Sequence, residues 1–193
     1  ENNMKINPDR LFILKRTKKN GLGTAYISGF RWCLERGYDF ICEMDCDFSH
    51  NPKDLKRLIA ECEENGSDMS IGSRYVTGVN VVNWPMSRVL MSYYASAYVR
   101  VITGMKIRDT TAGFVCYSRK VLESIDLNKI KFKGYAFQIE MKFKATLHKF
   151  KITEVPIIFT DRTLGVSKMS KGIFKEAVFG VIEMKIKSWF GKR

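Results

Sequence analysis

The chain has 193 residues, of which 45% are hydrophobic and 27% charged. This length and apolar content predict one folded domain with a core of its own, and they exclude a disordered or low-complexity protein. The formal net charge of +13 at pH 7 favours polyanionic partners, which include phosphorylated substrates, anionic membranes and nucleic acids.

The five cysteines show no paired Cys-x-x-Cys spacing, and only two histidines accompany them. This pattern predicts reduced thiols without structural zinc, which is typical of a cytoplasmic protein. We find neither an apolar run of membrane-spanning length nor a signal peptide. The chain begins with Glu1 instead of Met, so we expect that a segment precedes it.

Short apolar runs alternate with helical stretches along the chain, which predicts an α/β fold with a mostly parallel sheet flanked by helices. In chain order, strands are expected near Leu11–Leu14, Asp39–Met44, Asp68–Gly72, Val115–Tyr117 and Ile152–Phe159. The expected helices are Gly23–Arg36, Pro52–Asn65, Trp84–Thr103, Phe137–His148 and Ser170–Phe190.

Two acidic residues, Asp45 and Asp47, follow the predicted strand Asp39–Met44. In extended chain their side chains project on the same side. Two carboxylates can hold Mg²⁺ or Mn²⁺ against a diphosphate, and ligands of parallel sheets bind beyond the carboxyl ends of the strands. The alternative is that both acids are solvated or cap the next helix.

Six short motifs occur between positions 19 and 168: Lys19–Ala25, Met44–Ser49, Gly72–Tyr75, Asp109–Phe114, Gly134–Glu140 and Asp161–Lys168. In this order they resemble the dolichol-phosphate mannose synthase branch of the family-2 glycosyltransferases. The resemblance implies a GT-A, Rossmann-like fold, a divalent metal and a nucleotide-sugar donor. The implied reaction is transfer of a hexose with inversion to the phosphate of a polyprenyl lipid, and we expect the hexose to be mannose from GDP-mannose.

Such an acceptor phosphate is largely a dianion at neutral pH, so the reaction needs charge control more than a strong base. The resemblance assigns Asp45 and Asp47 to the metal and the donor diphosphate. Arg74, Arg88 and Ser92 are the expected ligands of the acceptor phosphate, because Arg binds phosphate through two nitrogens and the last two residues lie on one helix face. The alternative for each arginine is an ordinary surface position.

By the same resemblance, the Gly165-containing loop closes over donor or acceptor phosphate through Arg162, Ser167 and Lys168. Gln138 and Glu140 are expected near the acceptor. An exposed basic turn and an ordinary helix surface are the respective alternatives. Ser49 stands where some members carry a longer Gln, so it is not assigned to the metal. The residues expected to act in catalysis are Asp47, Arg74, Glu140 and Arg162.

Two motifs of the family are absent: the Pro-Thr-Tyr-Asn-Glu-like and Asp-Asp-x-Ser-x-Asp-like segments that hold the base and ribose. We therefore expect residues 1–168 to form a partial GT-A catalytic domain, incomplete at the N-terminus and weak in donor binding. An exposed strand edge would favour self-association.

Residues 169–193 are expected to form a basic amphipathic helix that ends in Trp189-Phe190. Such a helix can lie in the headgroup region of an anionic membrane, here as peripheral attachment to the cytoplasmic face. The alternative is packing on its own domain or on a partner subunit.

Two other functions stay open. The same fold can use another donor, such as UDP-glucose, or another acceptor. A non-catalytic basic module is also compatible with the charge, but the chain has no zinc-finger or RNA-recognition signature, so no nucleic acid is expected as a partner.

Overall fold

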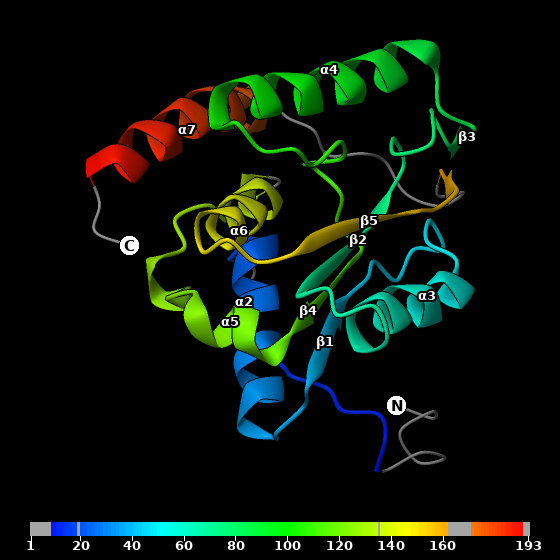
Figure 1. Cartoon of the computed structure of the whole chain (residues 1–193), viewed down its shortest axis with the longest axis vertical. Helices are drawn as coiled ribbons and strands as arrows, with labels where there is room; N and C mark the ends of the chain where they lie inside the picture. The colour runs from blue at the N-terminus through cyan, green and yellow to red at the C-terminus, as the bar shows by residue number, and fades with distance from the viewer. Residues whose placement is uncertain (1–8, 19, 135, 162–170, 191–193) are drawn as a thin grey trace.

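The computed structural model describes residues 9–18, 20–134, 136–161 and 171–190. A four-stranded sheet forms its centre, in the order β1-β4-β2-β5 (Figure 1). The strands are β1 (Phe40–Glu43), β2 (Met69–Ser73), β4 (Val115–Ser118) and β5 (Ile152–Pro156). A separate small sheet pairs β3 (Val81–Val82) with β6 (Phe159–Thr160).

Helices cover both faces of the central sheet. They are α2 (Leu22–Glu35), α3 (Pro52–Glu63), α4 (Met86–Thr103), α5 (Arg119–Ser124), α6 (Ala136–Leu147) and α7 (Lys171–Phe190), with a short 3₁₀ helix at Leu127–Lys129. Several boundaries follow from local chemistry. α3 begins at Pro52, and the side chain of Asn51 accepts a hydrogen bond of 3.0 Å from the backbone N–H of Lys53. α4 ends before Gly104, which has a φ of 79°.

The direction of the strands brings distant motifs to one edge of the sheet. β4 runs antiparallel to both β1 and β2, and β2 runs parallel to β5, so β1, β2 and β5 all point the same way. The carboxyl ends of these three strands therefore share an edge with the amino end of β4. This arrangement confirms the predicted α/β fold, with β4 as its opposing strand.

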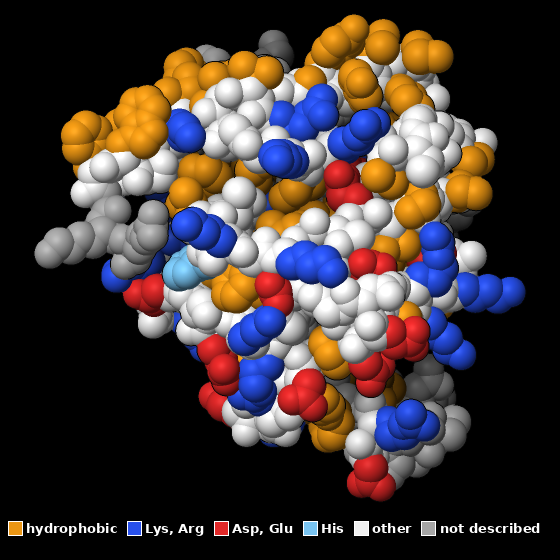
Figure 2. Space-filling model, in the orientation of Figure 1, with side chains coloured by type: hydrophobic (Ala, Val, Ile, Leu, Met, Phe, Trp, Pro, Cys, Tyr) orange, Lys and Arg blue, Asp and Glu red, His pale blue; other side chains and the backbone are white. Residues whose placement is uncertain are grey.

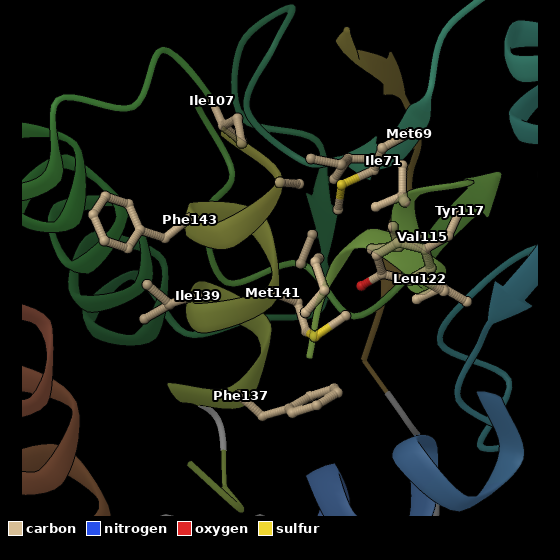
Figure 3. Close-up of a cluster of buried hydrophobic side chains, with 14 of the residues drawn as sticks. Met69, Ile71, Ile107, Val115, Tyr117, Leu122, Phe137, Ile139, Met141 and Phe143 are labelled. Carbon is tan, nitrogen blue, oxygen red and sulfur yellow. The ribbon is translucent and has the colours of Figure 1, made fainter. Parts of the chain in front are cut away.

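The central strands separate two apolar clusters. Val115 and Tyr117 of β4 belong to the cluster on the α6 side, whereas Cys116 of β4 and the preceding Phe114 belong to the cluster beneath α3. Figure 3 shows the first cluster, in which Met141 of α6 points toward β2 and β4, whereas Ile139 points away from them. This alternation is the period-2 pattern of a strand that is buried on both faces.

The structure corrects two of the predicted strands. Residues 11–14 form no strand, and their side chains are largely exposed, with the Phe12 ring resting on Trp32 at a centroid distance of 4.9 Å. A strand is stable only with a hydrogen-bonded neighbour, and β1 pairs only with β4 among the described residues. The predicted strand Ile152–Phe159 divides into β5 and β6, because the chain leaves β2 and pairs with β3.

The last helix packs on the body of the protein beside α4. The Tyr98 hydroxyl donates to the backbone oxygen of Val178 at 2.9 Å, and Lys185 Nζ donates to the backbone oxygen of Thr103 at 3.0 Å. Val181 is buried in this contact, whereas Phe179 and Trp189 are exposed. Apolar side chains of α7 thus face both the protein and the solvent, and the membrane role of this helix stays a prediction.

Gly23, in the first of the predicted motifs, lies where α2 meets α6. A Cβ added at this position would lie 2.7 Å from Phe137 Cδ2 and 2.9 Å from the backbone oxygen of Phe132. Gly29, on the same helix, has no atom within 4 Å of such a Cβ. We therefore expect Gly23→Ala to lower the free energy of unfolding by roughly 1–3 kcal/mol through overpacking. Gly29→Ala is the matched control and should raise it by roughly 0.5–1 kcal/mol. Urea unfolding measures both, and equal effects would contradict the close approach of α2 to α6.

Candidate active site

The two motif carboxylates lie directly after β1 and are half-buried. Asp45 Oδ1 accepts a hydrogen bond of 3.1 Å from the Tyr26 hydroxyl on α2. Asp47 Oδ1 accepts two bonds from Ser49, at 3.1 Å from its backbone N–H and 2.6 Å from its hydroxyl. Both carboxylates are therefore oriented by protein donors, Asp45 by Tyr26 and Asp47 by Ser49.

The chemistry of this pair fits a hard divalent cation. Carboxylate oxygens are the ligands that Mg²⁺ prefers, and this ion usually keeps positions for water and substrate phosphate. Within the described ranges, no group of three or more His, Cys, Asp or Glu side chains is placed to hold a metal. The assignment of Asp45 and Asp47 to a metal stays a prediction.

Arg74 follows β2 and forms a buried ion pair with Asp109 in the fourth motif. Its Nε donates to Oδ2 at 2.7 Å and its Nη2 donates to Oδ1 at 2.6 Å. The backbone N–H of Arg74 reaches the same carboxylate at 2.9 Å. Burial alone would raise the pKa of Asp109, but the charge and hydrogen bonds of Arg74 outweigh burial and lower it. The Nε–Nη2 fork of Arg74 is thus occupied, and its assignment to phosphate stays a prediction.

Arg88 and Ser92 lie one turn apart on α4, as predicted, and each has a partner. Arg88 Nη1 donates to Asp161 at 2.9 Å from Oδ1 and 2.8 Å from Oδ2. The hydroxyl of Tyr75 donates to Ser92 Oγ at 2.8 Å. The bond between Tyr75, which follows β2, and Ser92 places this part of α4 beside the end of β2.

Trp84 joins the two arginines. The Cζ of Arg88 lies 4.1 Å from the centroid of the Trp84 ring, and the Cζ of Arg74 lies 5.5 Å from a Trp84 ring centroid. Both distances are in the range of cation–π attraction. The site therefore contains two guanidinium groups close to one indole, one of them buried with Asp109 and the other half-buried with Asp161.

His50 connects the acids to this basic group through packing. Its ring lies 4.9 Å from Phe114 and 5.2 Å from Phe159, and Phe159 in turn lies 5.3 Å from Trp84, measured between ring centroids. Burial lowers the pKa of His50, so the imidazole is neutral at pH 7. A continuous row of rings thus runs from the segment after Asp47 to Arg88.

The α6 residues Gln138 and Glu140 are both buried, which excludes the alternative of an ordinary helix surface. Glu140 Oε2 accepts the backbone N–H groups of Lys131 at 2.9 Å and Phe132 at 3.0 Å, so its carboxylate supports a neighbouring loop. Burial raises the pKa of Glu140 despite these bonds. These contacts favour a structural task, and the catalytic role of Glu140 and the substrate role of Gln138 stay predictions.

Sequence reasoning missed a buried cation behind the site. Lys142 is fully buried, and its Nζ donates to the backbone oxygens of Ala112 at 2.6 Å and Gln138 at 3.3 Å. Burial lowers the pKa of Lys142 to about 8. It ties α6 to the Asp109–Phe114 motif. The available signal was a lysine one turn after Gln138 in a segment rich in apolar residues.

Three predicted residues, Arg162, Ser167 and Lys168, lie outside the described residues. Sequence reasoning also gave no role to Asp109, Tyr75 or Asp161, although each stands inside a motif. Their roles depend on partners that are distant in the chain.

Loss of the Asp109 charge would leave the Arg74 guanidinium buried without its counter-ion. We expect Asp109→Asn to lower the free energy of unfolding by roughly 3–5 kcal/mol, the usual cost of breaking a buried pair from one side. Asp54→Asn is the control, because Asp54 pairs with Arg57 at 2.6 Å on the surface of α3 and should cost at most roughly 1 kcal/mol. Chemical denaturation compares the two. If both variants lost a similarly small free energy of unfolding, the Arg74–Asp109 pair would not contribute the stability inferred for it.

Comparisons with known proteins identify the family of this chain. The chain is 49% identical over 180 residues to the polyprenol monophosphomannose synthase of Mycolicibacterium smegmatis, covering 93% of this chain and 68% of that protein. It is 48% identical over 182 residues to the undecaprenyl-phosphate mannosyltransferase of Micrococcus luteus, covering 94% of this chain and 74% of that protein.

Among solved structures, the glucosyl-3-phosphoglycerate synthase of Mycobacterium tuberculosis has the same fold. In complex with Mn²⁺, UDP-glucose and glycerol 3-phosphate it matches with a TM-score of 0.56 at 15% identity, over 88% of this chain and 55% of that one. Its complex with phosphoglyceric acid matches with a TM-score of 0.58 at 14% identity, over 96% and 58%. The chain thus spans little more than half of those solved chains. The family profile described as "Glycosyl transferase family 2" matches residues 1–126, and the chain belongs to this family.

Proposed function

We propose that the protein transfers a mannosyl group, with GDP-mannose as donor, to the phosphate of a polyprenyl lipid, with inversion at the anomeric carbon. The names of its two close relatives support this substrate class. The observation that carries the proposal is the placement of Asp45 and Asp47 at the sheet edge to which Arg74 and Arg88 come from other elements. In this proposal the acids hold a metal and Arg88 holds the acceptor phosphate, while Arg74 keeps its buried pair with Asp109.

In this reaction an oxygen of the acceptor phosphate attacks the anomeric carbon, and the bond from that carbon to the donor diphosphate breaks. The acceptor needs little deprotonation, because its second pKa is roughly 6. Asp45 and Asp47 would hold Mg²⁺ or Mn²⁺, which neutralises charge on the leaving diphosphate when bound. Arg88 and Ser92 hold the acceptor phosphate against the repulsion of the donor anion.

The metal assignment is tested with the full-length protein, a panel of GDP-mannose and UDP-glucose, and a short polyprenyl phosphate. Asp45→Asn and Asp47→Asn should each lower kcat/KM at least roughly a hundredfold, because they weaken charge stabilisation in the transition state. Chelation with EDTA should stop the wild type, and Mn²⁺ should restore it.

The control for both variants is Glu63→Gln, an exposed acid at the end of α3. Full activity of both aspartate variants would contradict the metal site. Label transferred from UDP-glucose but not from GDP-mannose would contradict the donor.

We further infer that the face formed by α4 and α7 lies on the cytoplasmic surface of the membrane. The two helices lie side by side along one border of the molecule (Figure 1). Figure 2 shows hydrophobic side chains gathered along this border. The exposed apolar residues include Met86, Leu90, Tyr94 and Val101 on α4 and Phe179, Ile186, Trp189 and Phe190 on α7. None of the helices that the structure describes is long and apolar enough to cross a bilayer.

The membrane contact is tested by replacing the aromatic end of α7. The double variant Trp189→Ser/Phe190→Ser should lower partitioning onto vesicles that contain anionic lipid by at least about tenfold, since two large apolar side chains are lost. Co-sedimentation measures the partitioning. Tyr38→Ser, which removes an exposed aromatic residue beside β1, should leave it unchanged. Equal partitioning of all proteins would refute this contact.

A further inference from the structure

The ion pair of Arg88 leaves one edge of its guanidinium group uncommitted. Both oxygens of Asp161 bind the same nitrogen, Nη1, at 2.9 and 2.8 Å. Across the described ranges of the chain, Nε and Nη2 of Arg88 make no hydrogen bond. The side chains remain accessible, at 30% exposure for Arg88 and 24% for Asp161. The Nε–Nη2 edge can bind a phosphate or carboxylate through two parallel bonds.

Arg74 provides the contrast within the same site. Its Nε and Nη2 both bind Asp109, at 2.7 and 2.6 Å, and its side chain is 10% exposed. The Nε–Nη2 edge of Arg74 is therefore occupied by Asp109, whereas Asp161 binds Arg88 only through Nη1. The Trp84 ring, 4.1 Å from the Cζ of Arg88, further restricts the plane of that guanidinium.

Ser92, one turn further along α4, is also held by a neighbour in a way that leaves a donor available. The buried Tyr75 hydroxyl is the donor in its 2.8 Å bond to Ser92 Oγ. Because Ser92 accepts this bond, its own O–H is left to donate elsewhere. Arg88 and Ser92 lie four residues apart on one helix face, so both donors can serve one ligand.

We propose that Asp161 and Tyr75 are positioning residues of the acceptor-phosphate site, and this inference rests on the proposed function. Asp161 holds Arg88 by Nη1 so that the Nε–Nη2 edge binds the phosphate. Tyr75 holds Ser92 as an acceptor so that its hydroxyl donates to the same phosphate. Neither residue touches the reacting atoms.

If Asp161 instead competed with the acceptor phosphate for Arg88, its removal would change acceptor binding in the opposite direction. A carboxylate beside Arg88 also repels an incoming phosphate, so a competing Asp161 would weaken binding of the acceptor. Orientation predicts weaker binding when the carboxylate is removed, whereas competition predicts tighter binding. The sign of the change therefore decides between them.

The test uses the full-length protein and farnesyl phosphate, a short isoprenyl phosphate, with binding measured by calorimetry in the absence of any donor. We expect Asp161→Asn to raise the Kd roughly tenfold and Tyr75→Phe roughly fivefold, as for loss of hydrogen bonds that orient or include a charged group. In turnover, the KM for the acceptor should rise equally, while the KM for the sugar nucleotide stays within about twofold. The controls are Asp54→Asn, in the surface pair with Arg57, and Tyr38→Phe.

Coupled variants separate positioning from a merely structural effect. In an Arg88→Gln background, Asp161→Asn should add no further loss of farnesyl phosphate binding, and Tyr75→Phe should add none in a Ser92→Ala background. Full additivity in these backgrounds would overturn the inference, as would tighter binding by Asp161→Asn or absence of binding by the wild type. Thermal unfolding of each variant reports any loss of fold.

The binding measurement also distinguishes this inference from the proposed function. If farnesyl phosphate binds with the expected couplings but no mannose is transferred, the proposed function fails and the positioning roles stand. If mannose is transferred but Asp161→Asn and Tyr75→Phe bind acceptor as the wild type does, the positioning roles fail and the function stands.

Discussion

The buried pair of Arg74 and Asp109 is the interaction on which the rest of the site depends. It joins the end of β2 to the motif that enters β4, across a separation of 35 residues. Glu154 on β5 supports the same segment by accepting the backbone N–H groups of Arg108 at 2.7 Å and Asp109 at 2.8 Å. Lys142 holds it from α6 through Ala112. An antiparallel β4 between β1 and β2 makes these contacts possible, because its amino end lies at the carboxyl ends of its neighbours.

Around this pair, the site separates opposite charges by a layer of rings. Asp45 and Asp47 lie after β1, whereas Arg88 comes from α4, and His50, Phe159 and Trp84 fill the space between them. A transfer between two phosphorylated substrates must hold two anions close together, and separate cationic centres reduce their repulsion. The α4 helix also contributes to the exposed apolar face, so the phosphate ligands and the proposed membrane contact share one element.

Local sequence signals predicted most helices well, and the reasons are visible. Pro52 and Asn51 mark the start of α3, and Gly104 marks the end of α4, so those predictions depended on neighbours in the chain. The strand expected at Leu11–Leu14 was wrong because a strand requires a partner, which apolar content cannot supply. The single strand expected at Ile152–Phe159 was wrong for a related reason, since its second half pairs with β3 instead of β2.

The sequence by itself determined the class of the protein: the order of its motifs, the acid pair after an apolar strand, and candidate arginines on suitable elements. Only the tertiary structure decided how those arginines are engaged, with Arg74 closed by Asp109 and Arg88 held by one nitrogen. It also decided that Gln138 and Glu140 are buried and that α7 has apolar residues on two sides. Residue types and local spacing set what a side chain can bind. The order of strands in the sheet decides which distant residue that side chain actually contacts.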